Sequence, residues 1–386
     1  METKLSTVFV VAVLTTRMIM PGMPDMPAGM KIPGMEPTRS LTMTLTSGKD
    51  VDAKSKAQCA IPEGLKLGPK VDLQIDLPTR ETAPTGKDEA EQTKGEKVKF
   101  VMKTYWDCAE VVPPGQPKVI DTDKMMAGMG GGGMDLSKMM QAGAKMAPWR
   151  GDGSHAYWPG SKAKPIADGA ATPGPWELTT NYCGGTSLTF DEGQDFLAPL
   201  DLTSPGKGEL DVEKTIKVEW KAVPNAQAYL ITAFAAKDSV MVMWTSSAVP
   251  DSKLDASKAL GRDEVKTYIE KGILIPPTKT SCRIPAGIFK EVGAPMLSVT
   301  AIGVDKLQEK DGILTMVTVR SMATVMLGNM GLGGAPDEAA AEEQPKDEAA
   351  GKPESTDANG DPIDKASEKA NKAKDALNKL GNIFKR

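Results

Sequence analysis

The chain has 386 residues, a formal net charge of −4 and 25% charged residues, so its overall charge gives no reason to expect nucleic acid or acidic lipid as a partner. Aromatic residues make up only 5%, whereas 38 glycines and 29 prolines indicate strands, turns and loops with few long helices. The single histidine, His155, nearly excludes a histidine-based metal cluster. Its neighbours Gly151–Ser154 predict a surface loop, so a hydrolase built on His155 is the least favoured function.

The N-terminal residues contain a short apolar run, Val8–Leu14, preceded by Lys4. The run is too short to cross a bilayer, which takes about 20 residues, and its length is typical of the apolar region of a secretory signal peptide. No Ala-x-Ala cleavage site follows it, and a buried strand is the alternative interpretation. We expect a signal peptide over residues 1–17 and an extracytoplasmic protein that is periplasmic, envelope-bound or secreted.

Apolar and polar residues alternate through much of the chain, which predicts strands with one buried face. Two stretches rich in Met, Gly and Pro interrupt this pattern and predict linkers, and an acidic stretch near the end predicts disorder. The fold class that we expect is therefore mainly β, with two β-modules. In chain order the predicted parts are a signal peptide (1–17), a Met/Pro-rich extended segment (18–36), an N-terminal β-module (37–122), a Met/Gly-rich linker (123–150), a β-hairpin region (151–199), a β-sandwich with a helical insertion (200–330), a disordered acidic linker (331–361) and an amphipathic helix (362–386).

The clearest strand pattern lies in Ile216–Ala235. Ile216, Val218 and Trp220 alternate with charged residues, Pro224 interrupts the pattern, and a second alternating run begins at Ala228. This strand–turn–strand unit resembles the B–C hairpin of fibronectin type III-like and immunoglobulin-like sandwiches, in which a tryptophan and a tyrosine, here Trp220 and Tyr229, pack in the core.

The resemblance covers about residues 200–327 and implies an architecture that does not itself define a function. It implies that the strands predicted at Ser281–Pro285, Met296–Gly303 and Ile313–Val319 are E, F and G. A short helix predicted from Asp263, as its cap, to Gly272 is an insertion in this plan.

Four widely spaced cysteines lie next to predicted strands, and in an exported chain they are expected to be oxidised. Three pairings are open to them. We favour Cys59–Cys108 and Cys183–Cys282, one disulfide in each predicted module. The alternative is four buried thiols in a cytosolic protein.

No phosphate-binding loop, nucleophile elbow, zinc-protease motif or C-x-x-C pair occurs, so we expect a protein without enzymatic activity and without a cofactor. The methionines raise one alternative, because 13 of the 23 lie within residues 18–35 and 125–146. Thioethers suit copper(I), and Met18, Met20, Met23 and Met26 resemble the Met-rich tracts of periplasmic copper-handling proteins. A low-complexity linker is the competing interpretation of these residues.

Residues 363–386 carry apolar side chains at alternating spacings of three and four, which predicts an amphipathic helix. Such a helix would meet a partner helix or a membrane surface, or would be a passive tail. Taken together, we expect an exported or cell-envelope protein that acts in adhesion, scaffolding or protein interaction, with a protein or cell-surface partner. The alternative is a periplasmic copper(I)-binding protein.

Overall fold

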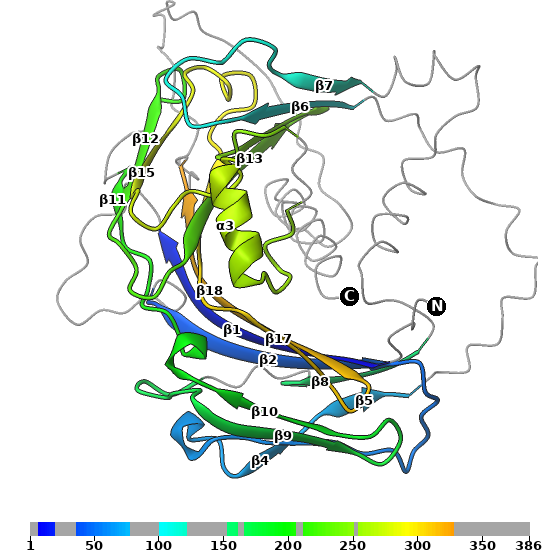
Figure 1. The fold of residues 1–386 in the computed structure, drawn as a ribbon. Helices are drawn as coiled ribbons and strands as arrows, with labels where there is room; N and C mark the ends of the chain where they lie inside the picture. The colour runs from blue at the N-terminus through cyan, green and yellow to red at the C-terminus, as the bar shows by residue number, and fades with distance from the viewer. Residues whose placement is uncertain are drawn as a thin grey trace, which may run out of the picture. The chain divides into compact units, whose positions relative to one another are not determined.

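The computed structural model describes residues 7–19, 36–77, 100–121, 153–160, 166–205, 211–250 and 254–327, and strands dominate them (Figure 1). The mainly β class expected from the sequence is confirmed. The strands are β1 (Thr7–Ile19), β2 (Thr38–Ser47), β3 (Ala57–Ala60), β4 (Lys70–Asp72), β5 (Gln74–Asp76), β6 (Val101–Trp106), β7 (Lys118–Asp121), β8 (Ser154–Trp158), β9 (Gly174–Thr180), β10 (Thr186–Phe190), β11 (Leu202–Ser204), β12 (Ile216–Trp220), β13 (Ala228–Lys237), β14 (Val240–Thr245), β15 (Ser281–Ile284), β16 (Met296–Ile302), β17 (Lys306–Lys310) and β18 (Ile313–Met326). The helical elements are α3 (Arg262–Glu270) and the 3₁₀ turns η1 (Glu63–Leu65) and η3 (Glu192–Gln194).

The strands form one large sheet and two small ones. The large sheet has 11 strands in the order β5-β8-β2-β1-β18-β16-β13-β14-β6-β7, and β17 pairs with the first half of β18. The small sheets have the orders β10-β9-β3-β4 and β11-β12-β15. Both small sheets lie on the same side of the curved large sheet, and α3 lies on the other side (Figure 1).

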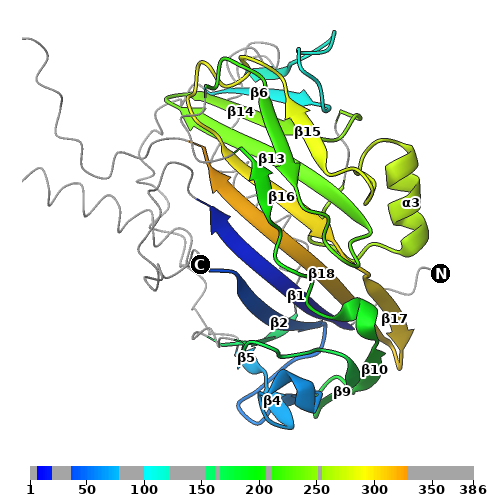
Figure 2. The ribbon, with the colours of Figure 1, turned by 90° about the vertical axis from the view of Figure 1, so that its left-hand side faces the viewer.

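The middle of the large sheet is a parallel pair, β1 and β18, which run side by side along its length (Figure 2). Thr7 pairs with Ile313 at one end and Ile19 with Val325 at the other, while β2 pairs with the opposite edge of β1. The β1 side chains Phe9 and Val11 are fully buried in the core. The structure therefore supports the buried-strand interpretation of these residues over the signal peptide at 1–17, because cleavage there would remove the strand to which both neighbours are hydrogen-bonded.

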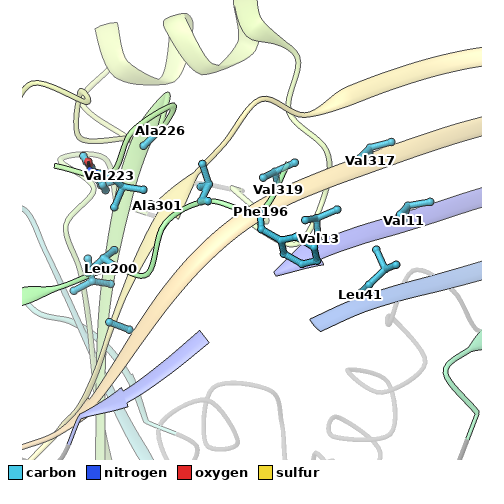
Figure 3. Close-up of a cluster of buried hydrophobic side chains, with 14 of the residues drawn as sticks. Val11, Val13, Leu41, Phe196, Leu200, Val223, Ala226, Ala301, Val317 and Val319 are labelled. Atoms are coloured by element: carbon cyan, nitrogen blue, oxygen red, sulfur yellow. Dashed lines mark hydrogen bonds between the residues drawn. The ribbon is translucent and has the colours of Figure 1, made fainter. Parts of the chain in front are cut away.

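The core between the large sheet and the small sheets is continuous (Figure 3). Val11 and Val317 lie in the half of the core that the four-stranded sheet covers, and Val223 and Ala301 lie in the other half. Phe196 lies between the two halves (Figure 3). The chain from η3 to β11 crosses the large sheet here and is held by side chains of that sheet. Thr15 Oγ1 donates to the carbonyl of Leu197 at 2.8 Å, and Ser321 Oγ donates to that of Ala198 at 2.8 Å.

The predicted unit around Trp220 and Tyr229 forms strands at β12 and β13, with the expected residues buried. The two aromatic rings meet edge to face at 5.1 Å between centroids, and Tyr229 Oη accepts a hydrogen bond from the backbone N–H of Val223 at 2.9 Å. The unit is nevertheless not a hairpin. β12 pairs with β11 and β15, whereas β13 pairs with β14 and β16, so the turn at Val223 carries the chain from one sheet to the other.

The bounds predicted for two separate β-modules do not coincide with the sheets. The large sheet takes β2, β5, β6 and β7 from the predicted module at 37–122, β8 from 151–199, and β13, β14, β16, β17 and β18 from 200–330, and β1 precedes both modules. The described residues instead form two sandwiches that share this sheet. Alternation predicted the strands, but it carries no information on which strand pairs with which.

The two sandwiches meet where the chain leaves β16 and turns into β17. Gly303 N donates to the carbonyl of Val319 at 2.8 Å, and a Cβ at position 303 would lie 2.8 Å from Val319 Cγ1, so glycine is needed for this close approach. Gln194, buried in η3, donates through Nε2 to the carbonyl of Val304 at 3.2 Å. These contacts hold the crossover from β16 to β17 against β18 on one side and against η3 on the other.

A buried ion pair, Asp305–Arg320, follows directly. The Asp305 side chain is fully buried and that of Arg320 is 7% exposed. The carboxylate also accepts hydrogen bonds from the backbone N–H groups of Val319 and Leu260, at 2.9 Å each. Every N–H of the guanidinium is used, on the two carboxylate oxygens and on the carbonyls of Ala256, Lys258 and Val319.

One disulfide, Cys108–Cys282, joins the segment after β6 to β15, with a Cα–Cα distance of 5.3 Å. Cys59 and Cys183 are free thiols, so the predicted pairings Cys59–Cys108 and Cys183–Cys282 are wrong. The reason is topological: β6 joins the large sheet beside β14, and the segment after it runs along β15. There Ala109 N donates to the Arg283 carbonyl at 3.0 Å.

We predict that Asp305→Asn lowers the free energy of unfolding by about 3–5 kcal/mol, because it leaves the Arg320 charge buried without a counter-charge. Denaturant unfolding followed by tryptophan fluorescence measures this. Asp263→Asn is the matched control, since the Asp263 side chain is 99% exposed in its ion pair with Lys266, and it should leave the midpoint unchanged. Equal midpoints for the two variants would contradict the importance given to the buried pair.

A second prediction concerns the disulfide. Cys108→Ser with Cys282→Ser should lower the free energy of unfolding by about 2–5 kcal/mol, because the bond closes a long loop in the unfolded chain, whereas Cys183→Ser should not. Peptide mapping after alkylation without reductant should give one linked pair and two alkylated cysteines. Four alkylated cysteines in protein from its native cells would contradict both the bond and an oxidising location.

Candidate functional site: the open face of the large sheet

One face of the large sheet is not covered by the small sheets, and we call it the open face. Strand β1 shows the difference between the two faces: Phe9, Val11 and Val13 are buried, whereas the alternate residues Val8 and Val10 are only half-buried. An apolar residue on an outward-facing position of a strand is unusual for a half-exposed sheet. The open face therefore differs from a solvent face in its chemistry.

The helix α3 covers part of the open face. Val265 of α3 packs with Ala228 of β13 and Ile302 of β16, and Tyr268 and Ile269 pack against the same cluster. The helix predicted at Asp263–Gly272 is thus present, but its N-cap is Gly261 and no side chain caps it. In the part of the chain that the structure describes, no helix has the length and hydrophobicity of a membrane span.

Methionines gather on the rest of the open face. Of the nine methionines among the described residues, only Met43 lies in the core between the sheets, and the strand registers place the other eight on the open face. Met18 is 40% exposed, Met243 42% and Met296 47%. The eight are Met18, Met102, Met241, Met243, Met296, Met316, Met322 and Met326.

The exposed apolar residues form cross-strand neighbours. Phe234 of β13 pairs with Met243 on one side and with Met296 on the other, and Met296 pairs with Met326 of β18. At the other end, Leu307 of β17 is 48% exposed and pairs with Met316. Methionine is flexible and polarisable, and it is over-used on surfaces that bind varied apolar partners. This arrangement is suited to binding.

The sequence contains a signal for this surface, and it lies in the strands and not in the methionine-rich linkers. In Val240–Thr245, Met241 and Met243 alternate with buried Val242 and Trp244. The methionines therefore take the positions of this strand that point away from the core. Met316, Met322 and Met326 do the same in β18.

His155 lies in β8, not in the predicted surface loop, and it is half-buried. Its Nδ1 lies 3.3 Å from Thr46 Oγ1 of β2. Two shallow hollows lie beside residues 50–58, and neither is lined by His155. Within the described ranges no group of three or more His, Cys, Asp and Glu side chains is placed to bind a metal ion.

The other candidate residues divide between the described and undescribed parts of the chain. Met18 lies near the end of β1, with Thr324 as its partner in β18. Met20, Met23 and Met26, the linkers at 123–150 and 331–361, and the helix predicted at 362–386 lie outside the described residues.

The two free thiols differ in their surroundings. Cys59 is fully buried in β3, and burial raises the pKa of its thiol to about 12. Cys183 is half-buried in the turn after β9, with its Sγ 3.3 Å from Thr180 Oγ1. Since the thiolate is the reactive form, Cys59 is inert in the folded protein.

Comparison of this chain with protein-family models, with curated proteins and with solved structures finds no match. The function must therefore be argued from the chain's own residues.

We predict that iodoacetamide at pH 8 modifies Cys183 well before Cys59 in the folded protein, and both at equal rates in denaturant. The raised pKa of Cys59 also has a consequence for stability. The thiol stays protonated in the folded state, whereas the thiol of the unfolded chain ionises above its ordinary pKa of 9.0. The contribution of Cys59 to the free energy of unfolding therefore falls as pH rises from 9.0 towards 12. Mass spectrometry of time points measures the rates, and rapid native labelling of Cys59 would contradict its burial.

Proposed function

We propose that this protein is a non-enzymatic binding protein that works outside the reducing cytosol, in the cell envelope or after secretion, and that a protein or cell-surface partner binds its open face. The observation that carries the proposal is the exposure of Met243 and Met296 on either side of Phe234 at one end of the open face, with Leu307 exposed at the other end. Large apolar side chains that remain exposed together mark interaction surfaces. The net charge of −4 gives no support to nucleic acid as the partner.

The strand order supports a sandwich like those of fibronectin type III and immunoglobulin domains. β11-β12-β15 corresponds to A-B-E, and β14-β13-β16-β18 corresponds to C′-C-F-G, with the crossing between B and C at Val223. In this proposal β1, β2, β8 and β5 extend the sheet beyond strand G, and β6 and β7 extend it beyond strand C′. Domains of this architecture serve many functions, so the binding role rests on the open face and not on the fold.

The location rests on the disulfide. A bond between Cys108 and Cys282 that braces two sheets favours an oxidising compartment, because cytosolic thiols are kept reduced. Residues 1–17 contribute nothing to this argument, since β1 is a strand of the sheet. The amphipathic helix at 363–386 stays a prediction of a further contact with a membrane or a helix.

The test uses a photo-crosslinking amino acid placed at one position at a time in the full chain in its native cells. Positions 243 and 307 lie on the open face, and the exposed Glu192 in η3 is the control, since η3 belongs to the side that carries the small sheets. We expect the same discrete cross-linked partner from 243 and 307, none from 192, and its loss in a Met296→Lys variant. Identical products from all three positions, or none from 243 and 307, would contradict the proposal.

A further inference from the structure

Four of the open-face methionines surround a single small residue, Thr324. Met322 and Met326 lie two residues to either side of it on β18, and Met18 of β1 is its direct cross-strand partner. On the other side, Ser298 of β16 pairs with Thr324, and Met296 pairs with Met326. Three adjacent strands thus present four thioethers around a hydroxyl-bearing position.

The register lets three of these sulfur atoms converge, because Met326 lies directly opposite Met296 and diagonally across from Met18. Met322 lies four residues from Met326 on the same strand and is too far away to join them. Directly opposed residues have Cβ atoms about 4.5–5.5 Å apart, and diagonal neighbours about 7–8 Å, within reach of long side chains. Methionine has three rotatable bonds, and the short side chains of Thr324 and Ser298 leave room between the longer ones. Met18 and Met296 are 40% and 47% exposed, so an ion from solvent can reach them.

The register partners of the cluster are uncharged. The register partners that face the cluster include Thr16 and Thr300, both opposite Met322, and Phe234, opposite Met296. Arg320, two residues before Met322, has its charge matched by Asp305. Hard divalent cations need carboxylate or carbonyl oxygens, whereas thioethers are soft ligands that select copper(I).

We propose that Met18, Met296 and Met326 form a binding site for one copper(I) ion on the open face. Three thioethers satisfy the ion without any change in protonation. Cysteine and imidazole ligands, in contrast, must lose a proton to bind a metal. Binding at this site should therefore have the same affinity at pH 5.5 and at pH 7.5. The site shares Met296 with the surface proposed above to bind a partner, but copper(I) binding by the purified chain requires no partner, so the two proposals are tested separately. The site needs none of the methionines outside the described residues.

The experiment measures anaerobic copper(I) binding by the full chain in competition with a chromophoric chelator. The test variant is Met18→Leu, Met296→Leu and Met326→Leu, which keeps volume and apolar character. One control is Met102→Leu, Met241→Leu and Met316→Leu on the same face, and the other is Met20→Leu, Met23→Leu and Met26→Leu. We expect the test variant to lose one equivalent of copper(I), or to bind it at least tenfold more weakly, and both controls to keep it at both pH values.

A second measurement stands whether or not the test variant folds. In wild-type protein carrying ¹³C-labelled methionine methyl groups, one equivalent of silver(I), a stable probe for copper(I), should shift the signals of Met18, Met296 and Met326 together. Signals of these residues that stay unmoved at one equivalent would overturn the site. So would a folded test variant with wild-type stoichiometry and affinity, a loss confined to the Met20, Met23 and Met26 variant, or binding that weakens tenfold at pH 5.5.

Discussion

The rest of the structure depends on the Asp305–Arg320 pair, because it holds the point where one long sheet serves two sandwiches. The carboxylate joins the crossover after β16 to β18, and the guanidinium joins β18 to the loop at 256–260 that leads into α3. A buried charge pair is tolerated only when its remaining donors and acceptors are also bonded, and here they all are. A single network thus fixes the crossover after β16 and the loop before α3 against β18.

The same network covers part of the open face, because Arg320 lies at an open-face position of β18 and is bonded to the carbonyls of Ala256 and Lys258. The sheet beneath this loop is continuous. β18 pairs with β17 over its first half and with β16 over its second, while β1 pairs with it throughout. Because these central strands are uninterrupted, outward side chains of the same strands lie on both sandwiches. The small sheets cover the opposite face. On the open face, α3 and the loop before it cover Ala228, Ile302 and Arg320, so the outward methionines of β1, β14, β16 and β18 remain available for binding.

Much of the local structure follows from the sequence, and much of the pairing does not. Alternation places β12 at Ile216–Trp220 and buries Tyr229 and Ile231 in β13, because burial on one face has a period of two. It cannot reveal that Val8–Leu14 pairs with residues near the other end of the described chain. The disulfide depends on that same long-range topology, so it could not be predicted from the spacing of the cysteines. The open-face methionines were visible in the pattern of β14 and β18, but their adjacency required the register.

The parallel pairing of β1 with β18 constrains how the protein is made. A ribosome releases β1 and β2 long before β18 exists, so during synthesis β1 has one open edge with full hydrogen-bonding capacity and an apolar face. Contacts of such large sequence separation form slowly, and exposed strand edges invite association with other chains. The β1–β2 hairpin therefore stays incomplete until β18 has been synthesised. A chaperone that shields the open edge of β1 during translation is the form of assistance that suits this topology.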